Sequence, residues 1–431
     1  MSHHRAIATV FAIHGAVAGS MSTRIPWLQG NLELTPETLG LVLLCQPIGA
    51  FIAMPMAARL AYRISGRTAT RLLIALWSAA VALPALAPSP AWLFPAFFLF
   101  GAAAGMSDVV MNAHAVVLER RLGRSIMSGL HGMWAVGSLT AGGIGALAAQ
   151  AGIDARLHLA AIALLLLAIG GLAGRDLYAD GRFGRATAST NGLSGRATAS
   201  MNGTSGRATA GADSVPGDTQ AADAPAPRRF ALPTLAILPI GLVGFCATFA
   251  EGASANWAAV YLTAVTEAGP GVAAAGYTVF MFCMAGTRLI GDRFIRRLGP
   301  VRAVRAGGVV AVLGGVIVVL ARTPALGIAG FALVGLGLAI VVPLVLAMAG
   351  NVGATPGEGV SGVATITYLS GMISPPVTGW LAGGLSYPAA FGVITGVVVA
   401  MTLLAGVLRP AANTFPQAPA EYRERGNFVE S

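Results

Sequence analysis

The sequence predicts an all-α membrane protein with twelve transmembrane helices, arranged as two pseudo-symmetric bundles of six. Three observations predict this fold: an excess of apolar residues, a series of long apolar runs, and arginines concentrated in alternate loops. Of the 431 residues, 55% are hydrophobic and only 10% are charged, whereas a soluble protein carries about 25% charged residues. So few charges cannot cover a water-exposed surface, which argues against a soluble globular enzyme and against a disordered chain.

Each apolar run is long enough for a helix to cross a bilayer, which takes roughly 20 residues. The runs occupy residues 6–23, 39–58, 70–87, 92–116, 128–149, 157–174, 231–250, 272–290, 303–321, 325–349, 360–383 and 388–408. The runs are uninterrupted and lack two-residue alternation, which excludes a closed barrel and leaves helices to satisfy the backbone in lipid. The first run resembles a signal peptide, but eleven more follow it, so we expect it to remain as an uncleaved span.

The basic residues indicate the orientation of these spans. All 27 are arginines, and placing the N-terminus in the cytoplasm puts 24 of them in cytoplasmic segments. Only Arg24, Arg156 and Arg322 then remain outside. Cytoplasmic loops carry the excess of basic residues in membrane proteins. We therefore expect a multi-pass protein of the cytoplasmic membrane with both termini cytoplasmic, and the net charge of +10 needs no nucleic-acid partner.

The longest polar stretch divides the chain into two sets of six spans. It contains the sequence Gly-Arg-Ala-Thr-Ala three times with a period of 11 residues and has few large apolar side chains. Such a segment cannot bury enough surface to order itself. We expect residues 1–174 to form the N-terminal bundle, 175–229 a disordered cytoplasmic linker, 230–409 the C-terminal bundle and 410–431 a cytoplasmic tail.

Two carboxylates lie well inside predicted spans, Asp108 in the fourth and Glu251 in the seventh. An ionised Asp at the centre of a membrane helix costs roughly 2.5–3.5 kcal/mol, so intramembrane acids are functional candidates. Asn112 follows Asp108 by one turn on a face that also carries Gly101 and Gly105, which favours close helix packing. No arginine lies within either of these two spans, and the flanks of Glu251 are almost wholly apolar. We therefore predict Glu251 as the first choice of proton carrier, with Asp108 also part of proton coupling.

Further polar and aromatic residues are candidates for substrate binding. His131 and Trp134 share a face of the fifth span, and His131 titrates near neutrality, so it is also a candidate for proton coupling. The other expected binding residues, beside Asp108 and Asn112, are Asn256, Trp257, Tyr277 and Tyr368. His14 is a weaker candidate on the first span, and Arg24 at its outer end is a candidate gate charge. For the intramembrane residues the alternative is a hydrogen bond or packing contact that only joins helices, and for Arg24 it is a solvated arginine in a loop.

The loops after the second and eighth spans carry basic motifs with Gly, Asp and Arg. The later copy contains the step Asp292-Arg293, and the earlier copy departs from it with Tyr62 in place of the Asp. With six plus six spans, these motifs resemble the major facilitator superfamily over nearly the whole chain. Residues 105–114, 124–134 and 250–257 are similar to a bacterial inner-membrane subgroup distantly related to fucose–proton symporters. The resemblance implies two halves that rock around a midplane site, with Asp292 and Arg293 as gating charges.

Taken together, these features predict a proton-coupled secondary active transporter that moves a small solute by alternating access. We expect no catalytic residues, metal or cofactor, because a Walker lysine is impossible in a chain without Lys and no His/Cys cluster has metal spacing. The expected partners are a small-molecule substrate, protons and the lipid bilayer, and we expect a monomer. Two alternatives remain open: a membrane-embedded sensor or scaffold that binds a ligand without transport, and an exporter of drugs or metabolites.

Overall fold

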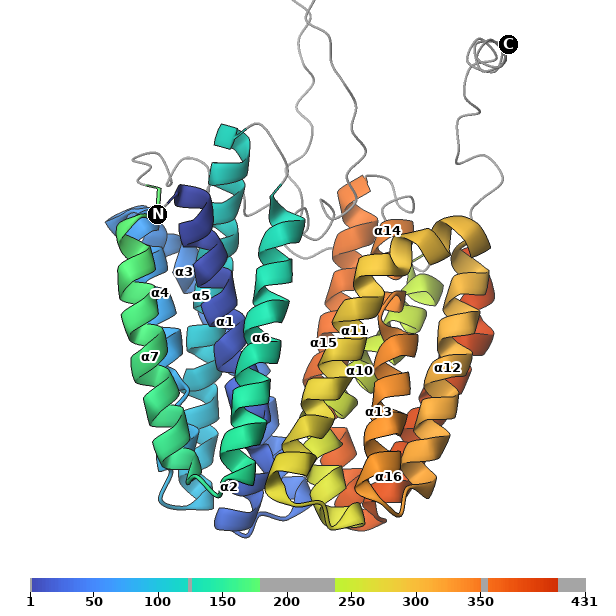
Figure 1. Cartoon of the computed structure of the whole chain (residues 1–431). Coiled ribbons are helices and arrows are strands. Elements are labelled where there is room, and N and C mark those ends of the chain that lie inside the picture. Colours follow the sequence, from blue (N-terminus) through green and yellow to red (C-terminus); the bar gives the residue numbers. More distant parts are fainter. Residues whose placement is uncertain (1, 123–125, 179–236, 350–355, 410–431) are drawn as a thin grey trace, which may run out of the picture.

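The computed structural model describes residues 2–122, 126–178, 237–349 and 356–409, and these residues form helices, turns and short connections without any strand. Two bundles of helices stand side by side with their axes roughly parallel (Figure 1). We call the side where α1 begins and α7 ends the terminal face, and the opposite side the turn face. The predicted linker and tail lie outside the described residues, apart from residues 175–178.

The N-terminal bundle contains residues 3–175. Its elements are α1 (His3–Ser22), α2 (Ile25–Asn31), α3 (Pro36–Ile64), α4 (Gly66–Ala80), η1 (Pro84–Leu86), α5 (Pro90–Leu122), α6 (Met127–Gln150) and α7 (Ala155–Arg175). Helices α1 and α2 together form the first span, interrupted at Thr23 and Arg24.

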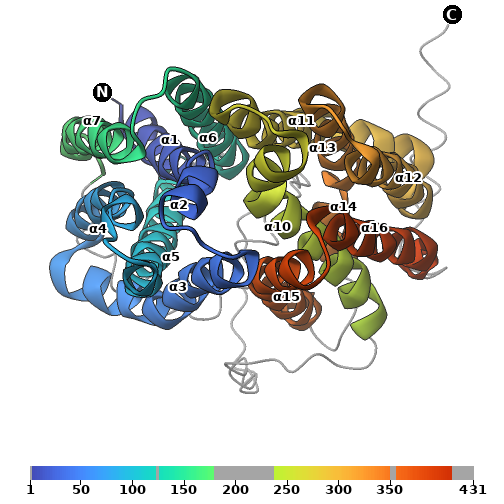
Figure 2. The ribbon, with the colours of Figure 1, turned by 90° about the horizontal axis from the view of Figure 1, so that it is seen from below.

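The C-terminal bundle repeats this order. Its elements are α10 (Leu238–Thr266), α11 (Pro270–Leu298), α12 (Pro300–Leu320), α13 (Pro324–Leu338), α14 (Val341–Ala349), α15 (Pro356–Gly384), α16 (Tyr387–Leu404) and η3 (Ala405–Leu408). Helices α13 and α14 form one span that is broken between Leu338 and Val341. Viewed along the helix axes, each bundle is a separate group of helices (Figure 2).

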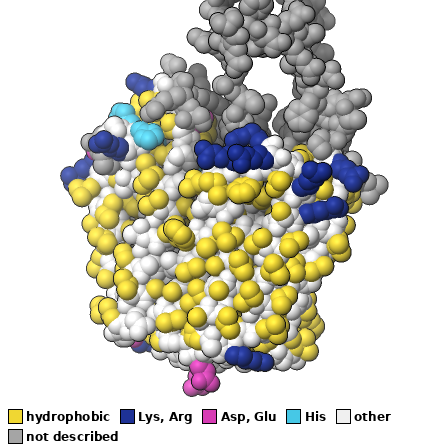
Figure 3. Space-filling model, turned by 45° about the vertical axis from the view of Figure 1, so that its right-hand side comes forward, with side chains coloured by type: hydrophobic (Ala, Val, Ile, Leu, Met, Phe, Trp, Pro, Cys, Tyr) yellow, Lys and Arg dark blue, Asp and Glu magenta, His cyan; other side chains and the backbone are white. Residues whose placement is uncertain are grey.

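Eleven segments of the described residues are long and apolar enough to cross a membrane. The twelfth span is α15, a 29-residue helix that packs against α10, α16 and α3. Apolar side chains cover the middle of the surface, with arginines gathered near the terminal face (Figure 3). The predicted fold class of twelve helices is therefore confirmed.

One predicted boundary is wrong by many residues. The seventh apolar run was expected at residues 231–250, but the helix α10 begins at Leu238 and continues without a break to Thr266. Its second part carries Glu251, Ser254 and Asn256, which end the apolar run. The helix continues because these polar groups have partners inside the protein: Asn256 Nδ2, for example, donates to the Gly252 carbonyl at 2.8 Å.

Glycines let helices approach closely in the N-terminal bundle. A Cβ atom on Gly15 would lie 1.9 Å from the Trp134 carbonyl oxygen, and one on Gly137 would lie 1.9 Å from that of Ala12. Helices α1 and α6 are therefore in backbone contact, as small residues allow in membrane bundles. This contact fixes the position of His14 relative to Trp134.

The two halves contact each other most closely toward the turn face. A Cβ atom on Gly379 of α15 would lie 2.3 Å from the Pro36 carbonyl oxygen of α3. One on Gly271 of α11 would lie 2.4 Å from the Gln150 side chain of α6. Gln29 also donates to the Tyr387 hydroxyl at 3.0 Å. The turn-face ends of the halves are thus packed together, which leaves room between them deeper in the molecule.

Candidate functional site

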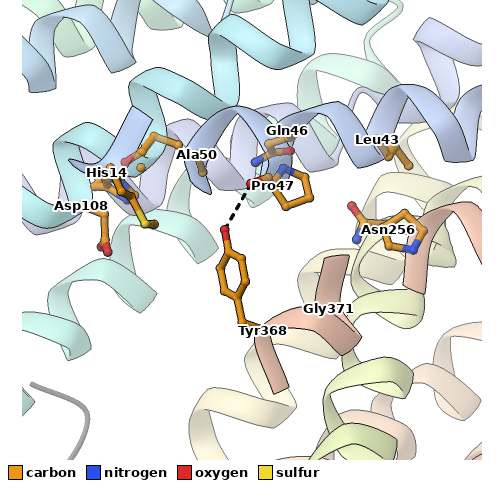
Figure 4. Close-up of a pocket in the computed structure, with 13 residues that line it drawn as sticks. His14, Leu43, Gln46, Pro47, Ala50, Asp108, Asn256, Tyr368 and Gly371 are labelled. Carbon is orange, nitrogen blue, oxygen red and sulfur yellow. Dashed lines mark hydrogen bonds between the residues drawn. The ribbon is translucent and has the colours of Figure 1, made fainter. Parts of the chain in front are cut away.

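A cavity of about 320 Å³ lies between the two halves (Figure 4). Helices α1, α3 and α5 line one side, and α10 and α15 line the other. The lining residues are His14, Leu43, Gln46, Pro47, Ala50, Met54, Ala104, Gly105, Asp108, Asn256, Tyr368, Gly371 and Pro375. A cavity of this size, apolar in part and with a few polar groups, is typical of small-molecule sites.

Asp108 reaches this cavity because α5 packs tightly on α3. A Cβ atom on Gly101 would lie 1.8 Å from the Gln46 carbonyl oxygen, and one on Gly105 would lie 2.8 Å from Ala50 Cα. The prediction that the face shared by Gly101, Gly105 and Asp108 lets another helix approach is therefore confirmed. The carboxylate of Asp108 projects into the cavity from the same side of α5 (Figure 4).

The carboxylate of Asp108 has an amide partner and, among the described residues, no cationic one. Asn112 Nδ2 donates to Asp108 Oδ1 at 3.0 Å and to the Asp108 backbone oxygen at 2.9 Å. The charge of Asp108 is close enough to act on His14, His131 and Tyr368. Asp108 therefore has no fixed ion pair in the described part of the chain, and two imidazoles and one phenol lie within range of its charge.

His14 is held in one neutral tautomer by its contacts. Trp134 Nε1 donates to His14 Nδ1 at 3.1 Å, and His14 Nε2 lies 3.4 Å from the Ala104 carbonyl oxygen. An indole N–H can only donate, so Nδ1 carries no proton and Nε2 carries it. Trp77 supports the ring from one side, with ring centroids 5.2 Å apart. A proton on Nδ1 would have to break the bond to Trp134.

Two prolines place unpaired backbone acceptors at the cavity. Pro47 in α3 and Pro375 in α15 have no N–H, so the carbonyls four residues earlier, at Leu43 and Gly371, lose their helical donors. All four residues line the cavity. Two serines hold α15 against α10 beside these prolines. Ser370 donates to the Phe245 carbonyl at 2.6 Å, and Ser374 donates to the Phe249 carbonyl at 2.8 Å. Pro375 and Pro376 thus do not interrupt the helix, and Pro47 and Pro375 supply acceptors to the cavity.

Tyr368 connects the halves at the cavity wall. Its hydroxyl donates to the Pro47 carbonyl oxygen at 3.2 Å, from α15 to α3 (Figure 4). Asn256 faces the cavity from α10, five residues beyond Glu251 and therefore on another side of the helix, as predicted. Polar groups from both halves thus converge on one space.

Glu251 lies in different surroundings from those expected. Arg288 Nη2 lies 3.1 Å from Glu251 Oε1 and 3.3 Å from Oε2, which forms a salt bridge. The span that carries Glu251 contains no arginine itself, but Arg288 reaches the acid from the membrane-spanning part of the neighbouring helix α11. Arg288 Nε also donates to the Ala339 carbonyl at 3.2 Å, at the break between α13 and α14. Glu251 therefore takes part in a contact that joins three spans.

Other expected binding residues lie around the cavity and not in its wall. Trp257 is fully buried, 6.2 Å from the ring of Tyr387, so it does not lie at a span end where a ligand could stack on it. Tyr277 is buried with its hydroxyl 3.4 Å from Ser138 Oγ, between the halves. His131 packs its ring edge-on against Phe11 at 5.3 Å. Trp134 and Asn112 act through His14 and Asp108.

The expected gating residues lie apart from one another. Arg24 is 2% exposed and its Nε donates to His158 Nδ1 at 3.1 Å, so it is not a solvent-exposed charge at the turn face. Burial follows from the break between α1 and α2, which turns the side chain inward. Arg293 is exposed near the terminal end of α11. The side chain of Asp292 lies outside the described part of the chain.

The sequence analysis missed Gln46 and gave His14 too little weight. Gln46 stands alone as a polar side chain in the apolar stretch from Leu39 to Phe51, so the rule that selected the carboxylates would have found it if amides had been counted. The partnership of His14 with Trp134 joins residues 120 positions apart, and no local pattern indicates it.

Comparison with known proteins agrees with this architecture. The family model of the Major Facilitator Superfamily matches residues 7–356 and 240–430. An uncharacterised MFS-type transporter of Yersinia pestis is 30% identical over 386 residues, which cover 89% of this chain and 90% of that protein.

Solved structures share the fold at low sequence identity. The nucleoside transporter NupG superposes with a TM-score of 0.70 at 13% identity, over 95% of this chain and 99% of that one. The fucose:proton symporter FucP of E. coli gives a TM-score of 0.53 at 16% identity, over 95% and 98%. Together with the twelve spans and the cavity between the halves, these matches identify the chain as a membrane transporter, and not an enzyme, that belongs to the Major Facilitator Superfamily.

Proposed function

We propose that this protein is a proton-coupled secondary active transporter that binds a small, uncharged, hydroxyl-rich solute in the central cavity. The observation that carries the proposal is the cavity itself, which is lined from both halves and contains the carboxylate of Asp108 with no cationic partner among the described residues. A site shared by two rigid halves can be exposed to either side of the membrane in turn.

The chemistry of the lining supports the choice of solute. Asp108, the carbonyls freed by Pro47 and Pro375, and the amide oxygens of Gln46 and Asn256 are hydrogen-bond acceptors. A solute with many hydroxyl donors satisfies them, whereas an anionic solute would be repelled by Asp108. The two solved structures of the same fold are a nucleoside transporter and a fucose:proton symporter, and both nucleosides and fucose carry several hydroxyl groups.

Proton coupling is proposed to run through Asp108 first. A carboxyl group in a poorly solvated membrane site has a lower free-energy cost when it is neutral than when it is ionised. Among the described residues no arginine binds Asp108, so we infer that this carboxyl group is the one that takes up the proton, with His131 and His14 as neighbours. Glu251 is a weaker candidate than the sequence suggested, because Arg288 stabilises its anion.

The orientation is part of the same proposal. Arginines at the terminal face, among them Arg63, Arg67, Arg296 and Arg302, are exposed or half-buried around that end of the bundles, whereas few lie near the turn face (Figure 3). We infer that the terminal face is cytoplasmic, in the cytoplasmic membrane. The packed turn face and the central cavity then correspond to a state closed toward the outside.

The experiment uses purified full-length protein in two steps. A panel of hexoses, polyols, nucleosides and small carboxylates is first scored by thermal shift, because a ligand of the native state stabilises it. Hits are then tested for uptake into proteoliposomes with and without an imposed pH gradient. We expect a neutral hydroxyl-rich solute to bind and to accumulate only with the gradient.

Three results would each contradict one part of the proposal. Binding without flux would favour the sensor or scaffold alternative. Preferential binding of carboxylates would contradict the inference that the cavity is lined by hydrogen-bond acceptors and repels anions. Outward movement driven by the inward proton gradient would identify an exporter and would keep the site but reverse the direction.

A further inference from the structure

A second cavity lies on the outer side of the N-terminal bundle, far from the solute site. It is a groove of about 420 Å³ between α4 and α7, two helices at the edge of the bundle away from the C-terminal half (Figure 2). The lining residues are Thr68, Arg71, Leu72 and Ala75 of α4 and Leu167, Gly170 and Gly171 of α7.

The groove is open because α7 presents glycines to α4. A Cβ atom on Gly171 would have nothing within 4 Å, and one on Gly170 would meet only Ile13 and Ile74 side chains at 3.5 and 3.9 Å. Around it, Leu72 and Leu172 are 52% and 62% exposed. Both helices are membrane spans, so these side chains face hydrocarbon and the groove has the shape and polarity to hold an acyl chain.

Arg71 supplies a positive charge at the terminal end of the groove. Its stem lies across Gly174, where a Cβ atom would be 2.8 Å from Arg71 Cγ. The neighbouring Arg67 donates to the Gly174 and Arg175 carbonyls at the end of α7. The exposed guanidinium of Arg71, by contrast, makes no hydrogen bond or ion pair with the part of the chain that the structure describes. Its charge is thus available to an anion, with the Thr68 hydroxyl one turn away.

The C-terminal bundle offers an internal comparison. Arg305 is the sixth residue of α12, as Arg71 is of α4, and Thr402 is the sixteenth residue of α16, as Gly170 is of α7. Thr402 packs so closely on α12 that a Cβ atom on Gly308 would lie 2.1 Å from its hydroxyl. At the same two positions the N-terminal bundle has Gly170 on α7 and Ile74 on α4, so the small and large residues are exchanged between the helices. Helix α16 thus carries Thr402 and Leu403 where α7 carries Gly170 and Gly171.

We propose that the groove between α4 and α7 binds one anionic phospholipid, with the phosphate on Arg71 and Thr68 and an acyl chain along Leu72, Ala75 and Leu167. Arginine forms strong charge-assisted bonds to phosphate, and basic pockets between membrane helices on the cytoplasmic side suit acidic head groups. The apolar wall selects a lipid over a free phosphate, because only a lipid fills both parts of the site.

The test is lipid binding to the purified full-length protein, measured by native mass spectrometry after delipidation. Phosphatidylglycerol and phosphatidylcholine with the same acyl chains are titrated, with glycerol 3-phosphate as the head-group control. Both lipids carry a phosphate, but the choline ammonium of phosphatidylcholine cancels its charge and is repelled by Arg71. We therefore expect one phosphatidylglycerol to bind at least about tenfold more tightly than phosphatidylcholine. Glycerol 3-phosphate should not compete at equal concentration.

Two variants and two matched controls locate the site. Arg71→Gln removes the charge, and Gly171→Leu fills the groove without a clash at Cβ; each should lower the phosphatidylglycerol affinity about tenfold. Arg305→Gln removes the corresponding arginine of α12, and Gly396→Leu adds a leucine on the exposed face of α16 where a Cβ atom has no neighbour within 4 Å. Both controls should bind phosphatidylglycerol as the parent protein does.

Three outcomes would overturn the proposal. Equal affinity for the two lipids would indicate unspecific lipid contact. Unchanged binding in both Arg71→Gln and Gly171→Leu would place the lipid elsewhere. Displacement by glycerol 3-phosphate would make this an anion site without a role for the acyl chain.

Discussion

The two intramembrane carboxylates of this protein lie in opposite electrostatic environments. Asp108 in the N-terminal half faces the central cavity, bonded to Asn112 and close to His14 and His131. Glu251 in the C-terminal half is bound by Arg288, which also holds the carbonyl of Ala339. An acid with a fixed cation is stabilised as an anion, whereas an acid beside amides and imidazoles can change its charge. The difference supports the proposal that Asp108 exchanges the proton, whereas the contacts of Glu251 position helices.

The largest effect should come from giving Asp108 an arginine of its own. In Asn112→Arg, the guanidinium would start one helical turn from Asp108 and hold its carboxylate ionised. We expect solute accumulation under an imposed pH gradient to fall by about 10- to 100-fold, the range that a cation at close distance produces in proton occupancy. Initial uptake rates in proteoliposomes measure it.

The control for this variant is Asn112→Gln, which keeps an amide that can reach Asp108. It should retain most of the uptake. If Asn112→Arg accumulates solute as well as the control does, Asp108 need not change its charge during transport.

The next effect concerns the Glu251–Arg288 pair. Arg288→Gln leaves Glu251 without its cation and frees the Ala339 carbonyl. We expect a loss of about 1 kcal/mol, the upper range for partly exposed ion pairs, seen as a decrease of about 2–4 °C in the unfolding temperature. The double variant Glu251→Gln/Arg288→Gln should recover part of the loss, because it leaves no unpaired charge.

A double-mutant cycle compares the parent protein, Glu251→Gln, Arg288→Gln and the double variant. Their thermal unfolding gives the coupling free energy between Glu251 and Arg288. A coupling near zero would mean that the pair does not position the helices. The claim that Glu251 positions helices, in contrast to Asp108, would then be wrong.

How far the sequence predicts these features depends on how local they are. The six-plus-six order of spans and the gathering of arginines could be predicted, because apolar length and charge are read along the chain. The end of α10 could not, because Glu251 and Asn256 are satisfied inside the protein by Arg288 and by the Gly252 carbonyl. Hydropathy treats such polar groups as if they faced lipid.

The site was predicted only in part for a related reason. Asp108, Asn256 and Tyr368 were found because a polar group in an apolar run is costly wherever it points. Trp257 does not line the cavity, since it is fully buried against Tyr387 while its neighbour in sequence, Asn256, faces the cavity. The direction of a side chain depends on helix packing, and single spans do not determine it.

A smaller effect is expected from the contact that holds His14 neutral. Trp134→Phe removes the donor to His14 Nδ1 and keeps an aromatic ring against α1. A neutral hydrogen bond of this kind contributes about 0.5–1.5 kcal/mol. Because protonation of His14 no longer breaks a bond, the pH profile of uptake should shift toward higher pH, by at most about one pH unit. Uptake measured from pH 5 to 8 in the two proteins gives the shift, and coincident profiles would remove His14 from the proton path.

The smallest effect should come from Tyr368→Phe. The hydroxyl of Tyr368 makes one hydrogen bond between the halves, to the Pro47 carbonyl. Loss of this bond destabilises the conformation described here, relative to other conformations of the transporter, by about 1 kcal/mol. We expect the apparent KM for the solute to change by about fivefold or less, with accumulation preserved. A complete loss of transport would show that Tyr368 contributes more than this contact.

The measurement that tests the central claim most directly is transport by Asp108→Asn, compared in two modes in the same proteoliposomes. Asparagine keeps the shape of the acid and cannot exchange a proton. We predict that accumulation driven by an imposed pH gradient disappears, while counterflow exchange of preloaded solute continues, with weaker binding because one acceptor is lost. If Asp108→Asn still accumulates solute against its gradient under the pH difference, Asp108 is not the proton carrier.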